Sequence, residues 1–201
     1  MIFCMDIINE FHKIYSPNEL LKFIDKYIKY GYKGNNNKFY TDTFSDEFND
    51  DFHNCCIVQD YIGVLDTNIG TCWDQVKLER EWFLNNNYQI KTYFICFDIK
   101  ENHASHTFLV YENNNKYYYF EHSFEIYKGI HEFDNLNELL KYVVKNQINF
   151  VLENSNINYD LNDFVVLYEY SKPNKDCSVE EFFNNIMKGR LLDYKNICQK
   201  R

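Results

Sequence analysis

Hydrophobic positions along the chain follow helical spacing in some stretches and alternate or cluster in others. Apolar residues that recur every three or four positions predict amphipathic helices over residues 5–15, 16–34, 72–87, 135–148 and 178–196. Ser16 and Ser178 each stand where an N-cap belongs, and each is followed by a glutamate three residues later. Gly31 or Gly34 is expected to end the second helix.

Short runs of aromatic and β-branched residues predict strands, and they follow the third helix directly. We expect four of them, over residues 90–99, 106–112, 116–124 and 163–170. The run of three asparagines at 113–115 predicts a hairpin turn, because asparagine tolerates positive φ. Residues 55–65 fit a helix or a strand, 66–71 a turn, and the acidic segment 35–54 a loop with a short helical turn. Helices followed by antiparallel strands predict an α+β fold.

Composition limits the class of protein. The chain has 201 residues with 45% hydrophobic content, and only two prolines and six glycines, so we expect one domain over residues 1–201. The net charge of −9 argues against binding of nucleic acid, which needs clustered lysine and arginine. No segment has the ~20 consecutive apolar residues of a membrane helix, so no membrane partner is expected. The start of the chain lacks the features of a signal peptide, and the seven cysteines show no disulfide spacing, which favours reduced thiols and a cytoplasmic location.

One cysteine stands apart from the other six. Cys72 follows Gly70 and Thr71 at the start of the third predicted helix. There the helix dipole and the unpaired N–H groups would stabilise a thiolate and could donate hydrogen bonds to an oxyanion. Gly70 would let the backbone approach a substrate closely. The pattern therefore predicts a cysteine nucleophile, although a buried structural cysteine is the ordinary alternative.

A base and an acid follow on the predicted hairpin. With a two-residue turn at 113–114, His106 lies directly opposite Glu121. If the turn shifts so that Ser123 lies opposite His106, Glu121 becomes the diagonal neighbour on the same face. In the register between these two, Glu121 points to the other face and His122 opposes His106. Two of the three registers bring His106 and Glu121 together, with His103 and His122 as alternative bases.

This order of residues resembles the transglutaminase-like superfamily of papain-like cysteine enzymes. The resemblance covers residues 70–124: a Gly-x-Cys at a helix start, a strand, a His-x-aromatic strand and an acid near the end of the next strand. It implies a papain-like or transglutaminase-like core over about 55–170 with flanking helices at both ends. It assigns the nucleophile to Cys72, the base to His106 and the acid to Glu121. The family most often has aspartate in the third position.

The resemblance also suggests residues around the nucleophile. Related enzymes often place a glutamine or an aromatic residue upstream as an oxyanion donor, and Gln59 is the candidate here, with an ordinary exposed glutamine as the alternative. Trp73 is a candidate for the wall of the substrate groove, with a core tryptophan as the alternative. His53, Cys55 and Cys56 do not have the spacing of a zinc site, so no metal is expected.

Together these features predict a cysteine hydrolase or acyl transferase. It would act on peptide or protein amide bonds through a thioester intermediate, and its chemistry requires no cofactor. Two alternatives stay open: a peptide-binding module on the same fold without catalysis, and an acyl transferase like the arylamine N-acetyltransferases. The second has an Arg-Gly-Gly before its nucleophile, where this chain has Ile69, Gly70 and Thr71. Neither the substrate nor the oligomeric state follows from the sequence.

Overall fold

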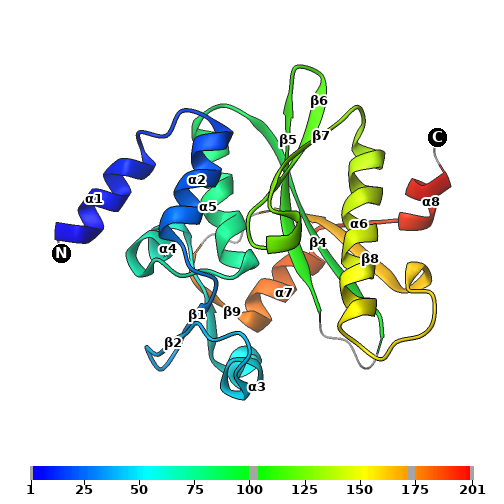
Figure 1. The fold of residues 1–201 in the computed structure, drawn as a ribbon, viewed down its shortest axis with the longest axis horizontal. Helices are drawn as coiled ribbons and strands as arrows, with labels where there is room; N and C mark the ends of the chain where they lie inside the picture. The colour runs from blue at the N-terminus through cyan, green and yellow to red at the C-terminus, as the bar shows by residue number, and fades with distance from the viewer. Residues whose placement is uncertain (1, 100–103, 172–174, 200–201) are drawn as a thin grey trace.

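The protein combines helices with two antiparallel sheets (Figure 1). The computed structural model describes residues 2–99, 104–171 and 175–199. The mixed α and β composition with antiparallel strands agrees with the prediction from the hydrophobic pattern.

The larger sheet has six strands in the order β10-β8-β4-β5-β6-β7, and every neighbouring pair is antiparallel. Its strands are β4 (Gln89–Phe97), β5 (His106–Asn113), β6 (Lys116–Glu121), β7 (Gly129–Phe133), β8 (Val165–Tyr170) and β10 (Arg190–Leu192). All four predicted strands are present. The edge strand β7 was not predicted, because its five residues alternate too briefly to stand out.

The turn between β5 and β6 fixes the register of the candidate base and acid. Asn113 pairs with Lys116, so the two turn residues are Asn114 and Asn115, both with positive φ. The hairpin turn predicted within 113–115 is therefore present, and its two turn residues are the last two asparagines rather than the first two. The structure instead has the second register considered above, in which Glu121 is the diagonal neighbour of His106 on one face.

Two long helices cover opposite faces of the larger sheet (Figure 1). They are α5 (Cys72–Asn85) and α6 (Leu136–Glu153). Phe108 and Val110 of β5 pack with α6, whereas Leu109 and Tyr111 pack on the side of α5. Because successive side chains of a strand point to opposite faces, a strand covered on both sides is apolar throughout, and this explains why β5 reads as a continuous hydrophobic run.

The smaller sheet lies at the lower left of Figure 1 and has the order β2-β1-β3-β9. Its strands are short: β1 (Tyr32–Gly34), β2 (Phe39–Tyr40), β3 (Cys56–Val58) and β9 (Cys177–Ser178). The predicted loop at 35–54 is wrong in its second half, which forms helix α3 (Asp46–Cys55) with Ser45 as its N-cap. The ambiguous segment 55–65 divides into β3 and helix α4 (Tyr61–Thr67).

The helices at the two ends of the chain differ from the prediction in length. The first are α1 (Ile2–Phe11) and α2 (Pro17–Tyr27), and the last are α7 (Val179–Met187) and α8 (Tyr194–Gln199). Ser16 and Ser178 cap α2 and α7 as predicted. Helix α2 ends before Gly31 because Ile28 is extended. The single C-terminal helix expected over 178–196 is wrong, because the chain leaves α7 near Gly189 and pairs β10 with β8.

Two short 3-10 helices complete the described elements: η1 (Glu125–Tyr127) and η2 (Asn162–Phe164). In the described part of the chain, no helix is long and apolar enough to cross a membrane.

Candidate active site

Cys72 is the first residue of α5, and the loop before it is held on both sides. Asn68 takes a left-handed conformation, and its carbonyl accepts a hydrogen bond from the backbone N–H of Lys29 (2.9 Å). The N–H of Gly70 donates to the carbonyl of Lys29 (3.0 Å). A Cβ at position 70 would lie 3.0 Å from the Cβ of Asp74, so glycine lets this loop fold close against the helix that it precedes.

A buried carboxylate fixes the first turn of α5. Asp74 accepts hydrogen bonds from the N–H and the hydroxyl of Thr71 (both 2.8 Å) and from the N–H of Gln59 (2.6 Å). Burial raises the pKa of Asp74 to about 6, and the hydrogen bonds from Thr71 and Gln59 oppose this shift. The arrangement is a helix-capping interaction three residues after the N-cap. It was missed in the sequence, although the spacing of Thr71 and Asp74 carries its signal.

The predicted base and acid are in direct contact. The Nε2 of His106 lies 2.7 Å from the Oε2 of Glu121, and both side chains are buried. The other carboxylate oxygen, Oε1, accepts from the N–H of Phe124 (2.7 Å) and the hydroxyl of Ser123 (3.1 Å), and the hydroxyl of Tyr119 donates to Oε2. Four donors therefore satisfy one buried carboxylate, which keeps it ionised in spite of burial.

The thiol of Cys72 meets the same imidazole. Burial alone would lower the pKa of His106, but the Glu121 carboxylate and the hydrogen bond with the Cys72 thiol outweigh it, so the pKa is raised. Conversely, His106 lowers the pKa of Glu121 against the effect of burial. Since Glu121 occupies Nε2, Nδ1 is the nitrogen left for the thiol. The structure thus brings together Cys72, His106 and Glu121, the three residues selected from the sequence.

Tyr30 is a neighbour of the thiol that the sequence did not reveal. The residue as a whole is 40% exposed, but its hydroxyl is buried against Cys72 and interacts with both the thiol and the backbone N–H of that residue. Burial and the Cys72 thiol raise the pKa of the Tyr30 hydroxyl well above its usual range. Tyr30 lies in the segment between α2 and β1, and no local pattern could relate it to a residue 42 positions later.

A cavity of about 530 Å³ opens beside Cys72. It lies between α3, the starts of α5 and β5, and the later part of α6. Trp73 forms part of its wall, as expected for a groove residue, and its indole is held by Phe182, which stacks at 4.8 Å, and by Phe52 at 5.1 Å. Trp73 is also only 2% exposed, so it serves the core at the same time.

Gln59 lies behind the nucleophile loop. Its side-chain amide donates to the carbonyl of Ile69 (2.9 Å) and its oxygen accepts from the hydroxyl of Thr67 (3.0 Å). It is 1% exposed and, among the described residues, does not line the cavity. The structure therefore gives Gln59 contacts that hold the loop before Cys72, whereas Tyr30 stands at the thiol.

The two alternative histidines have different outcomes. His122 is buried, and its Nδ1 lies 2.9 Å from the Oε1 of Gln75, so Nδ1 carries a proton and donates it. Burial, together with the charge of Lys128, lowers the pKa of His122 to about 4. Gln75 in turn donates to the carbonyl of Gly70 (2.9 Å), which makes His122 a support of the nucleophile loop. His103 lies outside the described residues.

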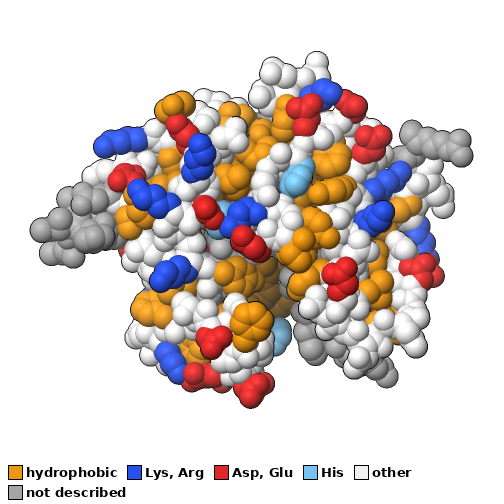
Figure 2. Space-filling view, in the orientation of Figure 1, with side chains coloured by type: hydrophobic (Ala, Val, Ile, Leu, Met, Phe, Trp, Pro, Cys, Tyr) orange, Lys and Arg blue, Asp and Glu red, His pale blue; other side chains and the backbone are white. Residues whose placement is uncertain are grey.

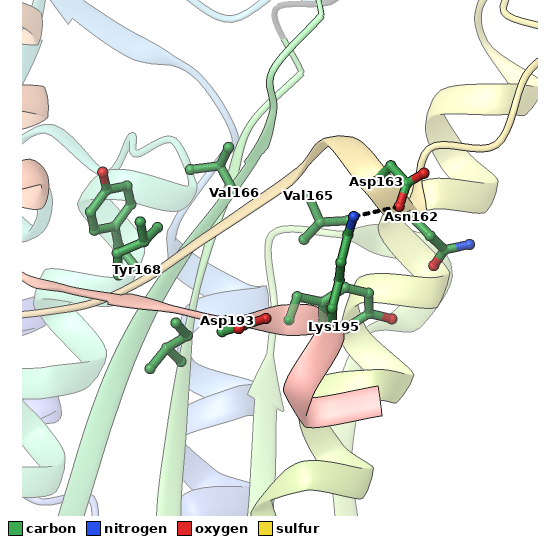
Figure 3. Close-up of a pocket in the computed structure, with 10 residues that line it drawn as sticks. Asn162, Asp163, Val165, Val166, Tyr168, Asp193 and Lys195 are labelled. Atoms are coloured by element: carbon green, nitrogen blue, oxygen red, sulfur yellow. Dashed lines mark ion pairs between the residues drawn. The ribbon is translucent and has the colours of Figure 1, made fainter. Parts of the chain in front are cut away.

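A second cavity, of about 550 Å³, lies at the other end of the larger sheet beside β8 and β10 (Figure 3). An ion pair between Lys195 and Asp163 (2.8 Å) crosses it. Its described lining includes Tyr168 and Tyr194 but no cysteine or histidine. This cavity therefore lacks the nucleophile and base that distinguish the one beside Cys72.

The described cysteines form no disulfide. Cys55, Cys56, Cys72, Cys96, Cys177 and Cys198 are free thiols. Within the described ranges, no three histidine, cysteine, aspartate or glutamate side chains are grouped so that they could hold a metal ion.

Comparison of the chain with protein-family models, with curated proteins and with solved structures gave no match. The likeness to the transglutaminase-like superfamily therefore stays a prediction.

Proposed function

We propose that this protein is a cysteine hydrolase or acyl transferase that acts on peptide or protein amide bonds. The thiolate of Cys72 attacks the carbonyl carbon, and His106 protonates the departing amine. The resulting thioester is released by water or by an acceptor amine, from which His106 takes a proton. Glu121 holds the imidazole in the required orientation and stabilises its charged form.

One observation carries this proposal: a single buried imidazole has the Glu121 carboxylate at Nε2 and the Cys72 thiol as its other partner. A histidine kept only for packing would need neither a bonded carboxylate nor a thiol at the start of a helix. The raised pKa of His106 favours the imidazolium, which is the form that pairs with a thiolate.

We assign stabilisation of the oxyanion to two groups. The backbone N–H of Cys72 is at the first turn of α5, where helical N–H groups lack intrahelical partners. This N–H interacts with the hydroxyl of Tyr30. The proton of that hydroxyl is the second hydrogen-bond donor next to the thiol. A carbonyl oxygen bound between these two groups would gain both hydrogen bonds as its negative charge develops.

The arrangement also supports a papain-like or transglutaminase-like core as the finer description of the fold. The candidate nucleophile begins a helix, and the base and acid follow on adjacent strands of an antiparallel sheet. Glutamate stands where the family usually has aspartate. In the observed register, Ser123 is opposite His106 and Glu121 is the diagonal neighbour, so the longer side chain of glutamate helps to reach the imidazole.

Alkylation of thiols tests the proposal directly. At pH 6.5, iodoacetamide should label Cys72 at least 10-fold faster than Cys198, because pairing with an imidazolium favours the reactive thiolate. Cys198 is a suitable control because it is exposed, whereas Cys72 is 5% exposed and would react slowly on access alone. An activity-based probe for cysteine hydrolases should label the wild type and not Cys72→Ala. If Cys72 reacts no faster than Cys198, the peptide-binding alternative is favoured.

A further inference from the structure

The walls of the cavity beside Cys72 are unusually aromatic. Six rings from five parts of the chain surround it: Tyr30, Phe48, Phe52, Trp73, Phe150 and Phe183. Asn49 and Gln147 add two side-chain amides. Among the described lining residues there is no lysine, arginine, aspartate or glutamate. The described walls therefore offer a carboxylate no lysine or arginine, whereas the faces of the rings attract positive charge.

One edge of the cavity is acidic. Asn49 and His53 of α3 line it, and Asp46 and Asp50 lie three residues before them on the same helix. Residues three or four apart are neighbours on a helix surface, so these exposed aspartates lie beside two residues that line the cavity. Figure 2 shows the molecule hollowed between the part with α3 and the part with α6, with hydrophobic walls and with acidic side chains gathered on the side of α3.

A hydrophobic wall that leads to an acidic edge suits a long side chain with an apolar stem and a cationic end. Arginine fits better than lysine, because its planar guanidinium stacks on aromatic rings and is more weakly hydrated. The nearby Lys38 does not neutralise Asp46 or Asp50, since it is paired with Glu47.

We propose that this cavity selects peptide substrates with an arginine side chain next to the amide bond that Cys72 attacks. The stem packs among the rings and the guanidinium reaches the edge formed by Asp46 and Asp50. This inference rests on the proposed function, because it assigns the cavity to the substrate of Cys72.

The test uses peptidyl acyloxymethyl ketones, in which the thiolate forms a bond to the methylene carbon and the carboxylate leaves. Three reagents differ only in the side chain beside the ketone: arginine, the neutral isostere citrulline, and phenylalanine. For each reagent, the rate at which it inactivates the wild-type chain is divided by the rate at which iodoacetamide alkylates Cys72. The arginine reagent should react about 10-fold faster than the citrulline reagent, since a cation–π contact and two nearby carboxylates favour the charge.

Variants then test whether Asp46 and Asp50 cause the preference for arginine. The double variant Asp46→Asn, Asp50→Asn should reduce the preference for arginine over citrulline to about 3-fold and leave the iodoacetamide rate unchanged. Asp163→Asn, at the second cavity, is the control and should leave the preference intact. Both sites are exposed, so these variants should fold.

The outcomes separate the two proposals. A Cys72 that reacts with iodoacetamide no faster than Cys198 overturns the proposed function and this inference with it. A reactive Cys72 that prefers citrulline or phenylalanine, or treats all three reagents alike, overturns only the arginine preference. An equal loss of preference in Asp163→Asn and in the double variant would likewise contradict the role of α3.

Discussion

Two regions of the β5–β6 hairpin each contain a buried histidine, and their electrostatic environments are opposite. His106 is 5% exposed and His122 is 7% exposed, so burial does not distinguish them. His106 is bonded to a carboxylate, Glu121, and its pKa is raised. His122 is bonded to an amide, Gln75, and its pKa is lowered to about 4. At similar depth, the buried and directly bonded Glu121 carboxylate outweighs the effect of burial on the pKa of His106, whereas the exposed Asp25, 3.8 Å from the Nε2 of His122, does not outweigh it.

The largest effect should come from removing each imidazole in turn. His106→Asn should slow the labelling of Cys72 by an activity-based probe by about 10³-fold, because the proposed base is lost. His122→Asn keeps a donor for Gln75 and should change the same rate by less than about 3-fold. The rates are measured at pH 6.5 on variants whose folding is verified by circular dichroism. Equal losses in the two variants would mean that both histidines act only through the structure.

The second effect is on stability and concerns His122. The folded state keeps this histidine neutral down to about pH 4, whereas the unfolded chain protonates it near 6.5. The contribution of His122 is therefore fully present above pH 6.5 and is lost as the pH falls toward 4, by about 3 kcal/mol. Urea unfolding of the wild type and of His122→Gln at several pH values measures the difference between them.

A matched control is His12→Gln, which replaces an exposed histidine by the same residue type. Its unfolding is measured at the same pH values. If His122→Gln also loses stability in parallel with the wild type between pH 6.5 and 4, then His122 is not the group responsible.

The third effect concerns the carboxylate that distinguishes the two regions. Glu121→Gln should slow probe labelling by about 10²-fold, since the amide still holds the imidazole but no longer stabilises its charge. Because Glu121 raises the pKa of His106, the pH at which labelling falls on the alkaline side should move to a lower value in this variant. A profile of labelling rate against pH from 5 to 10 measures the shift. An unchanged alkaline limit would exclude Glu121 as the source of the raised pKa.

The larger sheet and its two covering helices could be predicted from the sequence, because each element has a distinct local pattern of hydrophobic residues. β4, β5, β6 and β8 are aromatic and β-branched runs, and α5 and α6 have a helical period over more than three turns. The candidate site could be narrowed to Cys72, His106 and Glu121 because helix start and strand order limit which side chains can meet.

The remaining features depend on contacts between distant segments. Three consecutive asparagines tolerate positive φ equally well, so the turn residues of the β5–β6 hairpin could not be chosen locally. The chain turns out of α7 at Gly189 and passes close to β8. A Cβ at this position would lie 2.4 Å from the carbonyl oxygen of Glu169, and this long-range contact could not be predicted from the local helical pattern. Tyr30 reaches Cys72 only through the bridge between Lys29 and Ile69, which brings the two segments side by side.

The packing of Trp73 against Phe182 has a consequence for the order of events during synthesis. Phe182 lies in α7, near the end of the chain, and the buried Lys77 of α5 donates to the carbonyl of Lys175 in the segment just before it. The first turns of α5 therefore lack part of their packing until these late residues have left the ribosome. If Cys72 is the nucleophile that we propose, its thiol should become reactive only at that stage, after translation has passed α7.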